Sequence, residues 1–155
     1  MILALQPLSQ QLTKNYMVKR MILIDTGVLA AFANLKDDNH TISINIMDQV
    51  VKKTYGTPLI TDYVLDEVVT LLYVRTKSPE ISLDIGTKIV NEKFGKYLKL
   101  SDKIIEQTWE IYKSLVYKGL SFTDCSLLVF GKSLSCDTIA TFDGGFKGLM
   151  NVINT

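Results

Sequence analysis

The chain has 155 residues, a formal net charge of +1 and a hydrophobic content of 47%. This length predicts one domain with its own core, and the composition is that of a folded chain rather than a disordered one. No apolar run reaches the roughly 18 residues of a membrane helix, and the first 16 residues lack the features of a secretory signal. We therefore expect a cytoplasmic protein.

The sequence offers few residues for nucleophilic or zinc chemistry. Cys125 and Cys136 form no CxxC pair, so they are predicted to be buried thiols rather than a zinc site. His40 is the only histidine, and no nucleophile motif or second ligand lies near it. A surface or helix-cap position is predicted for it.

The first predicted element follows an N-terminal extension over residues 1–20, for which an added helix and a misassigned start both remain open. The domain itself is predicted over 21–155. Residues 21–24 are consecutively apolar, which is typical of a strand buried on both faces of a parallel sheet. Asp25 follows at the carboxyl end of this strand, and a buried helix is predicted over 28–32.

Helices and strands alternate through the rest of the chain. Further helices are predicted over 40–55, 62–76, 79–93, 102–116 and 122–130. Gly56 is predicted to end the helix over 40–55. Further strands are predicted over 57–60, 97–100, 138–142 and 152–153. Alternation of this kind predicts right-handed crossovers. The predicted fold class is therefore α/β, a single three-layer domain with a mainly parallel sheet of about five strands flanked by helices.

Four acids are predicted to reach the same edge of this sheet. Asp25 and Asp143 follow strands, whereas Glu67 and Asp124 lie near the starts of helices that begin at that edge. Clustered carboxylates without a basic partner repel one another unless they hold a divalent cation. Ligation by oxygen alone favours Mg²⁺ or Mn²⁺, which activates water and stabilises a phosphate under attack.

Each acid also has an ordinary structural alternative. Asp25 fits an N-cap, Asp124 a first-turn acid and Glu67 a solvated helix residue. Asp143 precedes a glycine, a pair typical of a tight hairpin turn. Asp66 lies near the opposite margin of the same apolar arc as Glu67, so helix geometry barely separates these two acids.

Four segments resemble, in order and approximate spacing, the motifs of PIN-domain (PilT N-terminus) proteins. They are Ile24-Asp25-Thr26-Gly27-Val28-Leu29, Val64-Leu65-Asp66-Glu67, Leu120-Ser121-Phe122-Thr123-Asp124 and Thr141-Phe142-Asp143-Gly144-Gly145-Phe146. The resemblance covers about residues 21–153 and is greatest to VapC-type toxins of toxin–antitoxin pairs.

The resemblance implies a PIN-like fold and an endoribonuclease that depends on Mg²⁺ or Mn²⁺. It also implies a homodimer and a small antitoxin that inserts its tail into the acidic groove. The implied catalytic and metal-binding acids are Asp25, Glu67, Asp124 and Asp143. Thr26 and Thr141 are expected to hold these carboxylates by hydrogen bonds.

Two other functions remain open from the sequence. One is a phosphatase that uses Asp25 as its nucleophile, although the Asp-x-Asp pair usual for that chemistry is missing at this position. The other is a non-catalytic PIN-like module that binds RNA or protein. If the four acids form a metal site, 17 basic residues face 12 remaining acids, a balance of +5 that suits a polyanionic substrate. Candidate RNA-contacting cations are Lys52, Lys53, Arg75, Lys113 and Lys118.

Overall fold

Five parallel strands form one sheet in a computed structural model that describes residues 19–155. The strands are β1 Met21–Ile24, β2 Thr57–Thr61, β3 Lys96–Leu98, β4 Thr138–Ala140 and β5 Asn151–Ile153. Their order is β3-β2-β1-β4-β5, and each neighbouring pair is parallel. The parallel sheet expected from the sequence is confirmed. The predicted extension over residues 1–20 lies almost wholly outside the described residues.

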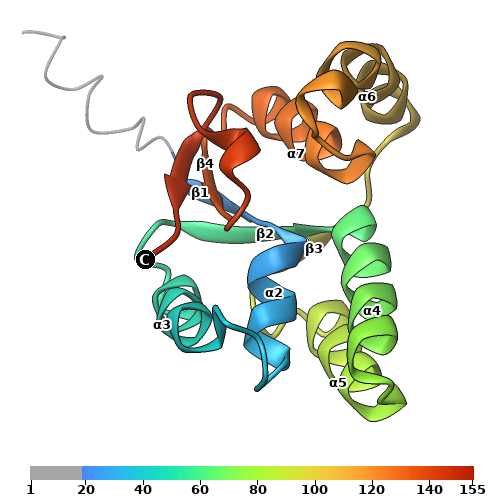
Figure 1. Cartoon of the computed structure of the whole chain (residues 1–155). Helices are drawn as coiled ribbons and strands as arrows, with labels where there is room; N and C mark the ends of the chain where they lie inside the picture. Colours follow the sequence, from blue (N-terminus) through green and yellow to red (C-terminus); the bar gives the residue numbers. More distant parts are fainter. Residues whose placement is uncertain (1–18) are drawn as a thin grey trace, which may run out of the picture.

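Helices cover both faces of this sheet. They are α2 Thr26–Ala33, α3 His40–Val51, α4 Asp62–Thr76, α5 Pro79–Val90, α6 Asp102–Leu115 and α7 Phe122–Ser133, with the short 3₁₀ turns η1 Val116–Lys118 and η2 Gly144–Phe146. Figure 1 shows α2, α3 and α5 on one side of the sheet and α6 and α7 on the other, with α4 packed against α2 and α5. This arrangement confirms the three-layer α/β fold. None of the helices in residues 19–155 combines the length and apolarity that a membrane span requires.

The core lies on both faces of the central strand β1. Ile22, Leu23 and Ile24 are each fully buried, because side chains that alternate across a strand meet a helix layer on either side. Ile60 of β2 and Ile139 of β4 are also fully buried beside them. The apolar run that precedes Asp25 thus places this acid at the middle of the sheet.

The helix predicted over 40–55 is shorter than expected, and Gly56 does not end it. Helix α3 ends at Val51, because Lys53 adopts the left-handed conformation with φ 59°. Gly56 has φ +99° and lies where a Cβ would be 2.1 Å from the carbonyl oxygen of Arg20. Its role is therefore to let this loop approach the start of β1 closely.

Other predicted boundaries differ by a few residues. Helix α5 ends at Val90 rather than near residue 93, because Glu92 takes a left-handed φ of 55°. Strand β4 ends at Ala140 rather than 142, because its neighbour β5 ends opposite it at Ile153. Cys125 and Cys136 are free, buried thiols, as predicted.

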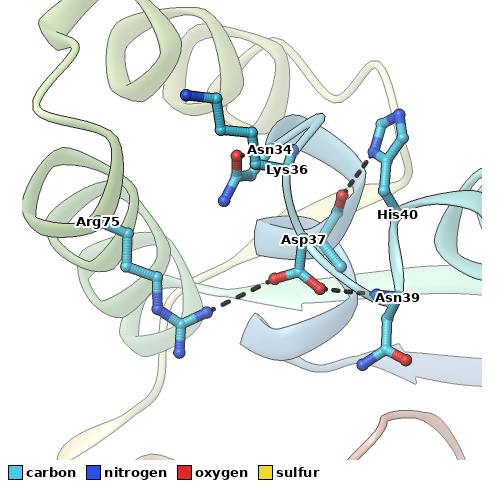
Figure 2. Close-up of polar contacts among 7 residues, drawn as sticks. Asn34, Lys36, Asp37, Asn39, His40 and Arg75 are labelled. Atoms are coloured by element: carbon cyan, nitrogen blue, oxygen red, sulfur yellow. Dashed lines mark hydrogen bonds and ion pairs between the residues drawn. The ribbon is translucent and has the colours of Figure 1, made fainter.

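The loop between α2 and α3 is tied to two neighbouring elements. Figure 2 shows the Arg75 guanidinium of α4 beside Asp37, with Nη1 and Oδ2 separated by 3.7 Å. The other Asp37 oxygen accepts a hydrogen bond from the Asn39 backbone at 2.9 Å. His40 is partly buried at the start of α3, and its Nδ1 lies 2.8 Å from the Ala31 carbonyl. His40 is therefore the first residue of α3 rather than its N-cap, which is Asn39, and its partly buried ring contacts the end of α2.

Candidate active site

Asp25 stands where the order of the strands reverses. Strands β2 and β3 follow on one side of β1, whereas β4 and β5 lie on its other side. In open α/β sheets, ligands bind outside the carboxyl ends of the strands at such a switch point. The backbone N–H of Asp25 continues the β1–β4 ladder by donating to the Ala140 carbonyl at 3.0 Å. Asp25 is then the N-cap of α2, so the strand ends at this carboxylate.

The Asp25 carboxylate is buried and held from two sides. Its Oδ1 accepts from the Thr26 backbone N–H at 2.7 Å, and its Oδ2 accepts from the Thr141 hydroxyl at 2.6 Å. Burial raises the pKa of Asp25 to about 7, an effect that the Thr141 bond opposes and that the charges of Asp124 and Glu67 reinforce. Asp25 therefore titrates near neutral pH in the absence of a cation.

Thr141 connects Asp25 to the turn that carries Asp143. The Thr141 hydroxyl donates to Asp25 and accepts from the Asp143 backbone N–H at 2.9 Å. The Asp143 side chain is exposed, and its Oδ1 accepts from the Gly145 N–H at 2.7 Å, which shapes η2. Because β4 and β5 are parallel, the alternative of a hairpin turn at Asp143 is wrong.

Asp124 is held in the first turn of α7 by a capping box. The Ser121 hydroxyl accepts from the Asp124 backbone N–H at 3.0 Å, and Asp124 Oδ2 accepts from the Ser121 N–H at 2.7 Å. Burial raises the pKa of Asp124, Ser121 opposes this rise, and the charges of Asp143 and Glu67 add to it. Sequence reasoning gave Ser121 no role, although the Ser-x-x-Asp spacing is itself a sign of a capping box.

Glu67 and Asp66 differ in burial and in their charge interactions, a distinction that the sequence barely made. Asp66 is exposed, whereas Glu67 is partly buried, and its charge raises the pKa values of both Asp25 and Asp124. Asp143 in turn acts on Asp124. Charge interactions therefore join Asp25 to Asp124 and Glu67, and Asp124 to Glu67 and Asp143. Asp25 is also the N-cap of α2, and Asp124 is also a first-turn acid of α7, so each has a structural role besides its place in the cluster.

The donor set of this cluster suits a hydrated hard cation. The side-chain atoms that this cluster offers to a cation are all carboxylate oxygens, and within residues 19–155 none of these acids forms an ion pair with Lys or Arg. In the same part of the chain, no three acid, His or Cys side chains are already close enough to hold an ion. Mg²⁺ is commonly bound through only one or two carboxylates and several waters, so a looser cluster fits it.

Thr26 presents its backbone, not its hydroxyl, to Asp25. The residue is 3% exposed, and its Oγ1 has no hydrogen-bond partner among the described residues. The two threonines expected to hold the carboxylates thus differ. Thr141 donates through its side chain, whereas Thr26 donates through its N–H.

Similarity to known proteins agrees with this fold. The chain is 30% identical to a VapC ribonuclease from Archaeoglobus fulgidus over 128 residues, which are 81% of this chain and 78% of the relative. Two solved structures share the fold at lower identity. The Mycobacterium tuberculosis toxin VapC20, which cleaves the sarcin-ricin loop, has a TM-score of 0.71 and 20% identity, with 81% of this chain and 92% of VapC20 covered. The Rickettsia felis VapBC2 structure, bound to promoter DNA, has a TM-score of 0.60 and 19% identity, with coverages of 86% and 98%.

No protein-family model matches the sequence. The relationship rests instead on the A. fulgidus relative, whose identity and coverage are both high enough to establish kinship, and on the shared PIN-like architecture. The chain belongs to the VapC ribonuclease family.

Proposed function

We propose that the protein is a divalent-metal-dependent endoribonuclease that hydrolyses RNA phosphodiester bonds. The observation that carries this proposal is the set of charge interactions that join Asp25, at the switch point of the sheet, to Glu67 and Asp124, and Asp124 to Asp143. An acidic cluster without a basic partner is suited to Mg²⁺ or Mn²⁺. Kinship with a VapC ribonuclease supports RNA as the substrate.

Asp25 and Asp124 are the principal proposed ligands, because both are buried and fixed by hydrogen bonds. Glu67, which is partly buried, and Asp143, which is exposed, complete the set of proposed ligands. When bound, the cation would offset the charge of the phosphate and lower the pKa of an attacking water. The half-charged state of Asp25 near pH 7 implies that protons and the cation compete for this carboxylate.

The surrounding residues orient these acids. Thr141 fixes one oxygen of Asp25 and the Thr26 N–H fixes the other, so both oxygens of this carboxylate are held in place. Ser121 fixes Asp124 Oδ2 in the same way, so Oδ1 is the oxygen left without a bond from Ser121. Hydrogen bonds of this kind select one rotamer and thereby reduce the cost of assembling the site.

A toxin role in a toxin–antitoxin pair belongs to the same proposal. It is supported by the fold shared with the toxin VapC20 and with the VapBC2 structure. The proposed partners are an RNA substrate, a small antitoxin protein and a second copy of the chain. The cytoplasmic location expected from the sequence fits two cysteines that remain free thiols.

The direct test is cleavage of mixed cellular RNA by the purified full chain with Mg²⁺, with Mn²⁺ and with excess EDTA. We expect either cation to support cleavage and EDTA to stop it. Asp124→Asn should reduce the rate by about 100-fold or more, because a ligand matters at least as much as its supporting partners. Asp66→Asn, an exposed neighbour of Glu67, is the matched control and should retain the parent rate.

Undiminished cleavage in EDTA would contradict the metal mechanism. No cleavage with either cation, in a protein that still binds RNA, would instead favour the non-catalytic module. A stable phosphoryl group on Asp25 after incubation with a phosphomonoester would favour the phosphatase.

A further inference from the structure

Four aromatic rings form a continuous row from three different helices. Phe122 of α7 lies between Tyr63 of α4, at 5.8 Å between ring centroids, and Tyr112 of α6, at 5.6 Å. Tyr112 then stacks with Trp109, one turn earlier on α6, at 6.0 Å and an interplanar angle of 29°. We refer to Tyr63, Phe122, Tyr112 and Trp109 as the aromatic row.

The inner end of the aromatic row adjoins the acid cluster. Phe122 and Asp124 occupy the same first turn of α7. Tyr63 lies four residues before Glu67 on α4, and residues with this spacing share one face of a helix. Two rings of the row, Phe122 and Tyr63, and two of the acids, Asp124 and Glu67, are therefore carried by the same two helices, α7 and α4.

The outer end of the aromatic row is open to solvent. The Trp109 side chain is 52% exposed, and the other three rings are each partly buried. A ring that serves only the core is covered, as Phe146 is at 0%. No hydrogen bond within residues 19–155 engages the Trp109 indole N–H or the hydroxyls of Tyr63 and Tyr112. The exposed part of the Trp109 ring and its indole N–H are thus available to a ligand.

Charge indicates which part of an RNA this row would contact. The four acids repel phosphates until a cation is present, so beside these acids the substrate is attracted through its neutral parts. Nearby on α6, the Lys113 ammonium is already paired with Glu110 at 2.6 Å. Unpaired nucleobases are neutral and stack on aromatic side chains irrespective of sequence.

We propose that the aromatic row binds unpaired bases of an RNA strand and so positions its backbone at the acid cluster. This inference rests on the proposed ribonuclease function. It concerns the unpaired stretches of that RNA, because paired bases cannot stack on protein rings. Trp109 and Tyr112 bind the outer bases, and Phe122 and Tyr63 bind those next to the cleaved bond.

Trp109 is the only tryptophan in the chain, so its fluorescence reports on the row directly. The full chain is titrated in EDTA, where no cleavage occurs, with an unstructured RNA of about ten nucleotides, a length within the range of known single-strand sites. We expect quenching by this strand. An abasic ribose-phosphate oligomer of the same length, and the same RNA fully paired in a duplex, should leave the emission unchanged.

Substitutions connect the signal to affinity. Trp109→Ala should weaken single-strand binding at least about fivefold, measured by anisotropy of a labelled RNA, because this is the lower limit for loss of one stacked base. Trp109→Phe should retain most of the affinity. Tyr73→Ala is the matched control, because Tyr73 is 53% exposed but lies eleven residues after the start of α4, away from the acids.

The outcomes separate this inference from the proposed function. Metal-dependent cleavage with no quenching and no effect of Trp109→Ala would overturn the aromatic row as a base-binding site while leaving the ribonuclease intact. Quenching by single strands without any cleavage would support the row and contradict the ribonuclease. If Trp109 emission instead changes with protein concentration, and Trp109→Ala halves the mass in solution, the row is a contact between copies and the inference is wrong.

Discussion

The Thr141 hydroxyl donates a 2.6 Å hydrogen bond to Asp25 Oδ2 across 116 positions of sequence. The same hydroxyl accepts from the backbone N–H of Asp143 at 2.9 Å, so one side chain sets the positions of two of the clustered acids. This is possible because β1 and β4 are adjacent, parallel strands that end at the same level. Thr141 therefore connects the Asp25 carboxylate to the backbone of the turn that carries Asp143.

Replacing Thr141 by Val should impair the site without unfolding the protein. The Thr141 bond lowers the pKa of Asp25, so its loss should raise that pKa further above 7 and strengthen proton competition with the cation. We expect the cleavage rate at neutral pH to fall by about 10–100-fold, the usual effect of removing a hydrogen-bond partner of a metal ligand. The acid limb of the pH–rate profile should also shift to higher pH. Thr141→Ser, which keeps the hydroxyl, should restore both, and an unshifted pH–rate profile in Thr141→Val would contradict this role.

Asp25 should make the metal-free protein less stable as the pH rises. Its folded pKa of about 7 exceeds its ordinary value of 3.8, so between these values the folded state keeps a proton that the unfolded state releases. The free energy of unfolding should therefore fall between about pH 4 and 7, by up to about 1.4 kcal/mol per pH unit from this group. Urea unfolding of the parent and Asp25→Asn in EDTA measures this, and the variant should gain relative stability as the pH rises.

Addition of Mg²⁺ at neutral pH should stabilise the parent more than the Asp25→Asn variant. A ligand that binds only the folded state stabilises it in proportion to its affinity, so the parent should gain more than Asp25→Asn. Parallel stability profiles for the two proteins in EDTA, together with equal Mg²⁺ increments in melting temperature, would show that Asp25 acts only as a helix cap.

The capping box of α7 should affect stability and activity together. Ser121→Ala removes the N-cap hydroxyl and should lower the free energy of unfolding by about 1 kcal/mol. It should also loosen the backbone of residue 121, whose N–H holds the Asp124 carboxylate. Ser101→Ala is a matched control, because Ser101 caps α6 through Ile104 in the same way. Urea unfolding should show similar losses, whereas initial cleavage rates should fall only in Ser121→Ala. Equal rates in both variants would mean that the box serves the helix alone.

Ion pairing distinguishes the cations proposed to contact RNA. Lys52, Arg75 and Lys113 are paired with neighbouring acids at 2.7, 3.7 and 2.6 Å respectively. Lys53 precedes β2 and so lies toward the opposite edge of the sheet from the acids. Lys118 has no ion pair within the part of the chain that the structure describes, and it is only six residues before Asp124. Lys118 is therefore the preferred contact.

Salt dependence of RNA affinity tests this preference. Each phosphate contact releases counterions, so Lys118→Gln should reduce the slope of log affinity against log salt by about 1. Lys52→Gln, which removes an exposed and paired lysine, should leave the slope near that of the parent. Titrations between low and moderate salt measure both slopes, and a flat response of the parent would contradict phosphate contacts altogether.

The sequence by itself determined the elements and their order. Continuous apolar strands, spaced helices and marked caps are local patterns, so they predicted α4 over 62–76 without error and a parallel sheet of five strands. Boundaries that depend on a left-handed residue were less predictable. Lys53 and Glu92 end their helices in a conformation that lysine and glutamate do not favour, and no sequence signal marks it.

Only the tertiary structure decided how the acids relate to one another. The choice of Glu67 over Asp66 depends on which face of α4 turns toward α7, and the pKa of Asp25 depends on burial by residues far away in sequence. The bond from Thr141 to Asp25 and the aromatic row likewise join separate elements. Local pattern specifies a helix or a strand, whereas charge, burial and contact across the sheet exist only after the crossovers have brought β1 and β4 together.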